Sequence, residues 1–374
     1  MPKPSASLLL HAFSTFAVGG PQARFAAIAN HFGRRYRHAI VAMDGNYACR
    51  DRLEPGLDID FPLGAPIKSS VLSNVLFIRR FLQRTNPDLL VTYNWGAIDW
   101  AMANAINPMM PRPLVRHIHA EDGFGPEEKD RQLMRRVMIR RLYLRRSTVV
   151  VPSQTLRRIA REVWRLDPER ILYVANGVPL PTASTPCDQS RVAANGTPCI
   201  GAVAGLRPEK NLGRLLRAFR RVIDKIEATL VLVGDGPDRA NLERLGCELG
   251  LGRSVRFFGH IEEPQKLYPT FDIFALSSDT EQMPITVLEA MASSLPIVAP
   301  DVGDIRLVVA PENQPLITSN NEEALAEALL RLLDDAGLRR RIGIANRLRA
   351  SRDFSQDAMF QAYQRLFDPA RQHA

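Results

Sequence analysis

Two apolar runs in the C-terminal half constrain the fold of this chain more than any other feature. Phe271–Leu276 and Leu295–Ala299 are almost entirely apolar, which is typical of strands buried inside a parallel sheet. Between them, Leu288 and Met291 recur at helical spacing, and Pro284 suits the first position of a helix, where a missing N–H is tolerated. A strand, a loop, a helix and a second strand in succession predict a crossover unit of a parallel sheet.

Two carboxylates flank the start of this helix, because Glu281 lies just before it and Glu289 in its second turn. Ligands of open parallel sheets bind at the carboxyl ends of the strands, and helix N-termini attract anions. The helix start at Met283, Pro284 and Ile285 suits a diphosphate, whereas carboxylates accept hydrogen bonds from sugar hydroxyls. The combination predicts a nucleotide-sugar site. The alternative is that both glutamates are solvated residues on the helix surface.

A second turn between a strand and a helix carries positive charge. Cys199–Val203 has the pattern of a strand, and Arg207 and Lys210 precede a helix with an apolar stripe. Two cations at such a turn can hold a diphosphate as the leaving group gains negative charge. The alternative is a pair of surface charges at the start of a helix.

The N-terminal part begins with a comparable pattern. Ser7–Phe13 predicts a buried strand, Gly19 and Gly20 allow a close backbone approach, and the segment 23–33 predicts a helix that ends at Gly33. A strand, a glycine-rich loop and a helix together form an anion-binding arrangement. Such a loop can also serve only to turn the chain.

His119 is the candidate site residue of the next strand. It lies at the carboxyl end of the predicted strand Pro113–Ile118 and is followed by Glu121, Asp122 and a glycine. We choose His119 rather than His117, because we expect strand alternation to point His117 to the opposite face. The alternative is a packed or solvated histidine.

The most basic segment of the chain is 131–146. Its apolar positions form a stripe: Leu133, Val137, Met138, Leu142 and Leu144. Arginines flank this stripe: Arg135, Arg136, Arg140, Arg141, Arg145 and Arg146. A basic amphipathic helix suits the surface of an anionic membrane. The alternative is an internal helix with a solvated basic face.

Composition bounds the class of protein. A chain of 374 residues, 45% hydrophobic and 24% charged, suggests roughly two globular domains. No apolar run approaches the ~18–20 residues of a membrane span, and the N-terminus has no signal-peptide pattern. The four cysteines show no metal-ligand spacing, so we expect free thiols and a cytoplasmic location. The net charge of +9 attracts anions such as nucleotide sugars, lipid headgroups and nucleic acids, without choosing among them.

Alternating strand and helix patterns in both halves predict two doubly wound, Rossmann-like α/β domains that face a central cleft. The segment 179–198 is dense in Pro, Thr, Ser and Asn and is interpreted as a linker. We expect an N-terminal domain over 1–180 and a C-terminal domain over 181–350. Residues 351–374 include an amphipathic helix.

The stretch that contains Glu281 and Glu289 resembles the Glu-x7-Glu signature of retaining glycosyltransferases of family 4 (glycosyl transferases group 1), which have the GT-B fold. The sequence "MPITVLEAMASSLPIVAPDVG" follows the family pattern nearly residue for residue, although Gln282 stands where the family usually has Gly. The resemblance covers 150–310 strongly and 1–150 more weakly.

The segment around Lys210 is similar to the family element Gly-Arg-Leu-x-x-Glu-Lys. Gly205 stands where the family has Arg, so the assignment of Arg207 to that role is a hypothesis. The resemblance implies that Glu281 contacts the hydroxyls of the donor sugar, Glu289 the ribose and His119 a sugar hydroxyl. It also implies that Lys210 stabilises the departing diphosphate.

The resemblance further implies transfer of a sugar from a nucleoside-diphosphate sugar, such as a UDP- or GDP-sugar, to an acceptor hydroxyl with retention at the anomeric carbon. The loop with Gly19 and Gly20 would help to place acceptor and donor. The acceptor would be a glycan or a lipid-linked glycan of bacterial surface polysaccharide or lipopolysaccharide assembly. In this fold the final helix usually crosses back to the N-terminal, acceptor-binding domain, while the C-terminal domain binds the nucleotide sugar.

Such enzymes often dock on the inner membrane, which the basic helix 131–146 would allow here. No Asp-x-Asp triplet stands at a plausible strand end, so we expect no metal requirement.

A second enzyme interpretation is a GT-B epimerase or hydrolase of sugar nucleotides, which needs a group of water-activating side chains in the first domain. A basic nucleic-acid-binding protein lacks a recognition motif and interleaved aromatics, so we expect no nucleic-acid partner. A third alternative is a catalytically silent scaffold.

Overall fold

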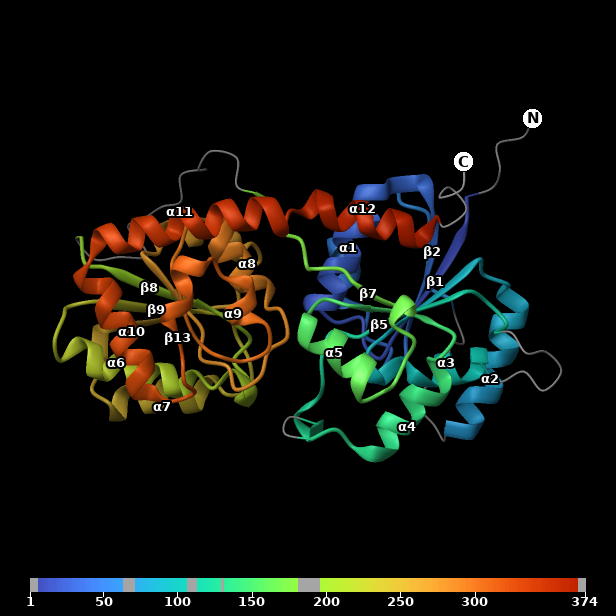
Figure 1. Ribbon diagram of the computed structural model, residues 1–374, viewed down its shortest axis with the longest axis horizontal. Helices are drawn as coiled ribbons and strands as arrows, with labels where there is room; N and C mark the ends of the chain where they lie inside the picture. The colour runs from blue at the N-terminus through green and yellow to red at the C-terminus, as the bar shows by residue number, and fades with distance from the viewer. Residues whose placement is uncertain (1–5, 63–70, 106–112, 129–130, 181–195, 369–374) are drawn as a thin grey trace. The chain divides into compact units, whose positions relative to one another are not determined.

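The structure is a computed structural model that describes residues 6–62, 71–105, 113–128, 131–180 and 196–368 (Figure 1). Most of the expected linker 179–198 lies outside these described residues. The chain forms two compact units, one of residues 1–175 together with 360–374, and the other of residues 176–359. Each unit contains one parallel sheet.

The first unit is built on a seven-stranded sheet with the order β3-β2-β1-β4-β5-β6-β7, in which all neighbouring strands are parallel. The strands are β1 Leu8–Phe13, β2 Arg37–Ala42, β3 Ile59–Asp60, β4 Leu89–Tyr93, β5 His117–Ala120, β6 Thr148–Val151 and β7 Ile171–Tyr173. The helices are α1 Gly20–Phe32, α2 Val71–Thr85, α3 Ile98–Ala105, α4 Met134–Tyr143 and α5 Gln154–Glu162. Figure 1 shows α1 on one face of this sheet and α2, α3 and α4 on the other, which explains why the central strands β1, β4 and β5 are buried along nearly their whole length.

The second unit is built on a six-stranded parallel sheet with the order β10-β9-β8-β11-β12-β13. The strands are β8 Cys199–Val203, β9 Thr229–Val233, β10 Val255–Gly259, β11 Ile273–Ala275, β12 Ile297–Pro300 and β13 Ile317–Thr318. The helices are α6 Leu212–Ile223, α7 Arg239–Glu248, α8 Ile285–Ala292, α9 Ile305–Val308, α10 Glu322–Asp334 and α11 Ala336–Asp353. The doubly wound α/β fold expected from the sequence is therefore confirmed for both units.

The order of strands reverses next to the first strand of each sheet. The reversal lies between β1 and β4 in the first unit and between β8 and β11 in the second. At such a point the loops that follow two neighbouring strands run in opposite directions and leave a crevice at the carboxyl edge of the sheet. This edge of the second sheet carries the turn after β8 and the loop after β11, where the candidate donor residues lie.

The last helix, α12 Gln356–Phe367, begins in the second unit and ends in the first. Its end is held within the first unit, because the Asp368 carboxylate accepts hydrogen bonds from Arg35 at 2.6 Å and from the Tyr36 hydroxyl at 2.9 Å. The Arg116 guanidinium donates to the Leu366 and Phe367 carbonyls, both at 2.8 Å. Among the described residues, none of the helices combines the length and the apolar content that crossing a membrane requires.

Candidate functional site

Lys210 and Glu281 meet at the carboxyl edge of the second sheet. Lys210 ends the short 3-10 helix Pro208–Lys210 after β8, and Glu281 lies between β11 and α8. The Lys210 Nζ donates to Glu281 Oε1 at 2.6 Å, with the two side chains 18% and 10% exposed. The Ser278 hydroxyl donates to the same carboxylate oxygen at 2.7 Å. The two charges are thus paired at the point where the strand order reverses.

A network around Arg214 holds the two loops together. Its guanidinium donates to Asp279 Oδ1 at 2.6 Å and to the Ser277 carbonyl at 2.9 Å. Asn211, a left-handed residue that caps α6, donates to the same Asp279 oxygen at 3.1 Å. The Ser277 hydroxyl in turn donates to the Lys210 carbonyl at 3.0 Å. These contacts fix the backbone on both sides of the Lys210–Glu281 pair, and no local pattern in the sequence indicates them.

The start of α8 differs by one residue from the expectation. Pro284 is the cap residue with extended backbone, and Ile285 is the first helical residue, so Pro284 does not occupy the first helical position. The carbonyl of Met283, a buried residue, accepts a hydrogen bond from the Asn176 amide at 2.9 Å. Met283, Pro284 and Ile285, which the sequence predicts to face a diphosphate, therefore lie at the beginning of this helix.

The loop before α8 depends on a glycine. Gly303 has a φ of 58°, and a β-carbon there would lie 2.1 Å from the Glu281 carbonyl oxygen. The neighbouring Asp304 N–H donates to the Gln282 carbonyl at 3.0 Å. Both the conformation and the lack of space exclude a side chain at this position. The close approach of the two backbones holds the peptide of Glu281 in place.

Glu289 contacts a buried tyrosine. The Tyr268 hydroxyl donates to Glu289 Oε2 at 2.7 Å, and Tyr268 is fully buried while Glu289 is half-buried. Burial and the neighbouring Glu289 charge raise the pKa of Tyr268 well above its usual value, so it remains a hydrogen-bond donor at neutral pH. The sequence does not reveal this partner, because the two residues belong to different elements on either side of β11.

Arg207 lies beside the position at which the resemblance departs from the family. Its side chain is 57% exposed, and its Nε contacts Glu209 Oε1 at 3.1 Å. The same Nε lies 3.5 Å from the point where a β-carbon on Gly205 would stand. The Arg207 side chain therefore passes over the residue that replaces the arginine of the family.

In the first unit, the candidate glycines begin α1. Gly19 is its extended cap residue and Gly20 its first residue. Arg24 of α1 is buried and pairs through both terminal nitrogens with the Asp122 carboxylate, one of these contacts being 2.8 Å long. The Asp122 N–H donates to Asn94 Oδ1 at 2.6 Å. Helix α1 and the loops after β4 and β5 are thus connected at the carboxyl edge of the first sheet.

The structure corrects the prediction for the two histidines of β5. The strand comprises His117–Ala120 rather than Pro113–Ile118, so His119 is inside it. The Thr92 hydroxyl contacts both His117 Nε2, at 2.9 Å, and His119 Nδ1, at 2.8 Å. The prediction that His117 points to the opposite face is wrong, because residues two positions apart in a strand share a face. His119 is fully buried.

His119 takes part in a buried ionic network. Its Nε2 lies 3.5 Å from Glu121 Oε2, which also accepts from Arg140 Nε at 3.0 Å. Arg140 Nη1 lies 3.4 Å from Glu128 Oε2, and all four side chains are buried. Although burial alone would raise the pKa of Glu121, Arg140 and His119 hold it below its usual range. Glu121 therefore stays ionised inside the protein.

The basic helix is partly internal. Arg140 of α4 is fully buried beneath the rings of Trp95, Phe124 and Trp164, about 5 Å from each ring centre. Two of the predicted apolar stripe residues, Val137 and Leu144, are also buried. The exposed apolar residues are Leu133, Met134, Met138 and Leu142. The helix thus has both an internal face and an exposed apolar face, and its binding to a membrane stays a prediction.

No group of three or more His, Cys, Asp or Glu side chains is placed to hold a metal ion within the described residues. The donor set at the Lys210–Glu281 pair contains one carboxylate beside a cation, which does not fit a divalent ion.

Comparisons with known proteins bear on the family and the fold of this chain. Residues 188–349 match the family described as glycosyl transferases group 1, and residues 18–181 match the family described as Glycosyltransferase Family 4. The lipopolysaccharide core biosynthesis glycosyltransferase LpsD of Rhizobium meliloti (strain 1021) is 29% identical over 233 residues, which cover 60% of this chain and 65% of the relative.

A GDP-mannose-dependent monoacylated alpha-(1-6)-phosphatidylinositol monomannoside mannosyltransferase of Corynebacterium glutamicum is 29% identical over 193 residues, covering 48% of this chain and 50% of the relative. The chain thus spans from half to just under two thirds of these two relatives' length. A crystal structure of HepE from Anabaena in complex with UDP and glucose covers 97% of this chain and 100% of that chain, at a TM-score of 0.80 and 18% identity. The two family matches together span most of the sequence, and the chain belongs to the group 1, family 4 glycosyltransferases with the GT-B fold.

Proposed function

We propose that the protein is a retaining glycosyltransferase that moves a sugar from a nucleoside-diphosphate sugar to an acceptor hydroxyl. The observation that carries this proposal is the Lys210–Glu281 pair at 2.6 Å, at the point of the second sheet where ligands of doubly wound folds bind. A cation for phosphate and a carboxylate for sugar hydroxyls stand side by side there. That combination matches the two chemical parts of a nucleotide sugar.

Lys210 stabilises the departing diphosphate in this proposal. Its ammonium group has three N–H donors, and the contact with Glu281 uses one of them. Arg207 and the start of α8 at Met283, Pro284 and Ile285 supply further positive potential. These groups act as the leaving group gains charge, which is when electrostatic stabilisation accelerates a reaction.

Glu281 and Glu289 orient the rest of the donor. Glu281 is held by Ser278 and Lys210, so its carboxylate is positioned before the sugar arrives. Glu289 is oriented by Tyr268 and accepts hydrogen bonds from the ribose. The second unit is thus the nucleotide-sugar-binding domain in this proposal.

The first unit binds the acceptor, with Gly19 and Gly20 at the start of α1 placing it. The role predicted for His119, contact with a sugar hydroxyl, stays a prediction. In the structure its two nitrogens face Thr92 and Glu121. A direct contact would require its imidazole to exchange Glu121 for a hydroxyl.

The donor is a UDP- or GDP-sugar, a choice supported by the GDP-mannose-dependent relative and by the UDP in the HepE structure. The LpsD relative supports an acceptor in lipopolysaccharide or a related surface glycolipid. We place the reaction in the bacterial cytoplasm, at the inner membrane. The diphosphate is neutralised by Lys210 and Arg207 in this mechanism, so we expect transfer to persist when divalent metals are chelated.

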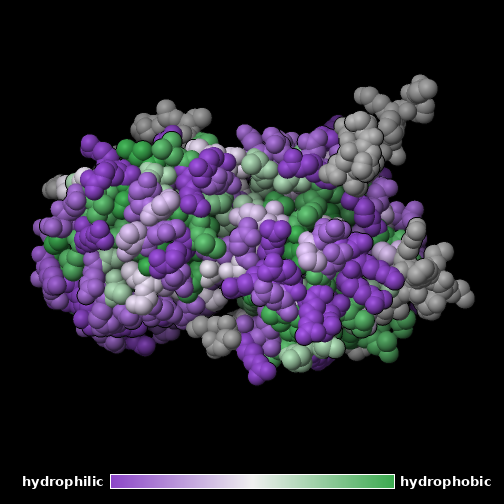
Figure 2. Space-filling view, in the orientation of Figure 1, coloured by the Kyte–Doolittle hydropathy of each residue, from purple (hydrophilic) through white to green (hydrophobic). Residues whose placement is uncertain are grey.

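α4 supplies the membrane contact. Met134, Met138 and Leu142 are exposed on this helix, and so is its cap residue Leu133, between the arginines of the segment 131–146. Figure 2 shows hydrophobic and hydrophilic residues interleaved over the part of the first unit where α4 lies. Apolar side chains enter the headgroup region while arginines pair with anionic lipids.

The decisive experiment combines donor binding with product analysis. Thermal unfolding with UDP-, GDP- and ADP-sugars identifies the donor, because a ligand that binds only the folded state raises the unfolding temperature. Incubation with that donor and a lipopolysaccharide acceptor is expected to yield glycosylated acceptor. A changed sugar nucleotide or free sugar as the only product would favour the epimerase or hydrolase. No binding to any sugar nucleotide would refute the proposal.

A further inference from the structure

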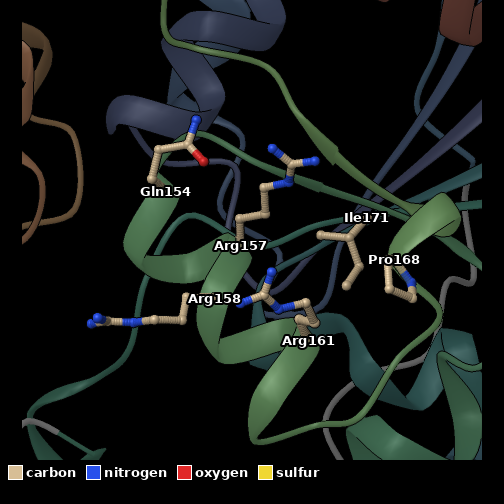
Figure 3. A pocket seen from close by; sticks show the side chains of 6 residues that line it. All are labelled: Gln154, Arg157, Arg158, Arg161, Pro168 and Ile171. Carbon is tan, nitrogen blue, oxygen red and sulfur yellow. The ribbon is translucent and has the colours of Figure 1, made fainter.

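One face of α5 lines a cavity of 270 Å³ in the first unit (Figure 3). Gln154, Arg157, Arg158 and Arg161 follow one another at helical spacing along this face, and Pro168 and Ile171 close the cavity from the segment that enters β7. The opposite face of α5 is apolar and packs into the unit. This packing holds the polar face outward.

The residues that line the cavity include three arginines and no acidic residue. Arg161 pairs with Glu162 at 2.6 Å, but Glu162 does not line the cavity and both side chains are more than half exposed. Within the described part of the chain, no ion pair joins Arg157 or Arg158 to an acidic residue. Like charges three and four residues apart on a helix repel each other, so an anion in the cavity would relieve this repulsion.

Figure 3 shows the guanidinium groups of Arg157 and Arg161 on the side of α5 that faces Pro168 and Ile171, while Arg158 extends the other way. Each guanidinium group presents a planar fork of N–H donors that suits the oxygens of a phosphoryl group, and these two lie four residues apart on one helix. The cavity is slightly smaller than a typical site for a drug-sized ligand, so it fits a phosphate or diphosphate group rather than a whole nucleotide sugar.

We infer that this cavity is a second anion site, which binds the phosphoryl group of a ligand other than the donor. The chemistry is that of a phosphate ester or diphosphate, carried either by a soluble molecule or by a lipid headgroup. The site belongs to the first unit, whereas Lys210 belongs to the second. The inference does not rest on transferase activity, because binding is measurable without turnover.

Isothermal titration calorimetry with inorganic pyrophosphate tests the site in a Lys210→Ala background, where the other diphosphate site is removed. We expect one site per chain, and at least a ten-fold loss of affinity when Arg157→Gln and Arg161→Gln are added. The matched control is Arg80→Gln with Arg84→Gln, which removes two exposed arginines at the same spacing from α2. This control is expected to retain the affinity of the background.

Two further arms separate the sources of the phosphate. Glycerol phosphate represents a soluble ligand, and vesicles of phosphatidylcholine with phosphatidic acid represent a lipid headgroup. A loss of glycerol phosphate binding in the Arg157/Arg161 variant, but not in the control, assigns a soluble ligand. A loss confined to the vesicles assigns a lipid. The inference is overturned if the Lys210→Ala protein does not bind pyrophosphate, or if removal of both arginines leaves that binding unchanged.

Discussion

Lys210 Nζ and Glu281 Oε1 lie 2.6 Å apart although the two residues are separated by 71 positions in the sequence. They meet because β8 and β11 are neighbours in the sheet and because Arg214 and Ser277 join the loops that follow these strands. A single ammonium–carboxylate contact therefore connects the two parts of the site that we propose for the diphosphate and for the sugar.

Lys210→Ala is expected to lower kcat/KM by roughly 100- to 1,000-fold, because it removes a cation aimed at the leaving group. It is also expected to abolish the rise in unfolding temperature produced by UDP or GDP. Lys266→Ala is the matched control, since Lys266 forms an exposed ion pair with Glu263. If UDP or GDP raises the unfolding temperature of Lys210→Ala as much as that of the unmodified protein, Lys210 does not bind the diphosphate.

Because Arg207 lies beside Gly205, we predict that an arginine at position 205 restores the donor binding that Arg207→Ala weakens. Arg207→Ala is expected to weaken donor binding by about ten-fold, the effect of losing one charge-assisted hydrogen bond. Adding Gly205→Arg to that variant is expected to restore binding. Among the described residues other than the two chain neighbours, the one atom within 4 Å of a β-carbon at position 205 belongs to Arg207 itself. The donor KM values of the unmodified protein, of Arg207→Ala and of the double variant test this prediction. Failure of rescue, with Arg207→Ala impaired, would mean that position 205 does not reach the diphosphate.

Gly303→Ala is expected to destabilise the second unit by ~3 kcal/mol or more and to raise the donor KM, since its β-carbon would clash with the Glu281 carbonyl oxygen. Gly250→Ala is the control for backbone strain alone. Gly250 has a φ of 65°, and no described residue other than its chain neighbours has an atom within 4 Å of a β-carbon there, so we expect a cost of ~1–2 kcal/mol and an unchanged KM. Chemical denaturation measures the loss of unfolding free energy in both variants. Equal losses would argue against a close approach of Gly303 to the Glu281 carbonyl.

His117 predicts an acid-sensitive fold. Burial, reinforced by neighbouring His119, lowers the pKa of His117 to about 3. The unfolded chain takes up this proton below about pH 6.5, whereas the folded chain does not until about pH 3, so stability falls as the pH falls between these values. His117→Gln is expected to flatten this slope of the unfolding free energy against pH. Exposed His260→Gln serves as the control, and an unchanged slope in His117→Gln would oppose the prediction.

The exposed face of α4 predicts membrane binding. Met138→Glu with Leu142→Glu is expected to reduce binding to vesicles that contain an anionic lipid by ten-fold or more, because it removes two apolar contacts and introduces repulsion. Ile344→Glu with Leu348→Glu on α11 is the matched control, an exposed apolar pair at the same helical spacing. Sedimentation with vesicles measures binding. Equal losses in the two variants would point to a general effect of charge.

The sequence alone determined the class of fold and the positions along the chain of the candidate donor residues. Apolar strand patterns, the helix start after Glu281 and the turn at Lys210 are local features, since each depends on residues close together in the chain. The elements predicted around β1, β8, β11 and α8 accordingly appear with small shifts in their bounds.

Tertiary structure alone decided which distant side chains became partners. Two pairs show this: Tyr268 with Glu289, and Arg140 with Glu121. The members of each pair lie on different parts of the fold, so no local spacing in the sequence predicts the contact. Arg140 shows most clearly why the sequence does not predict such partners. A basic residue on an amphipathic helix is expected to face solvent, but an internal carboxylate and three aromatic rings compensate its burial, and only the packed fold brings these groups together.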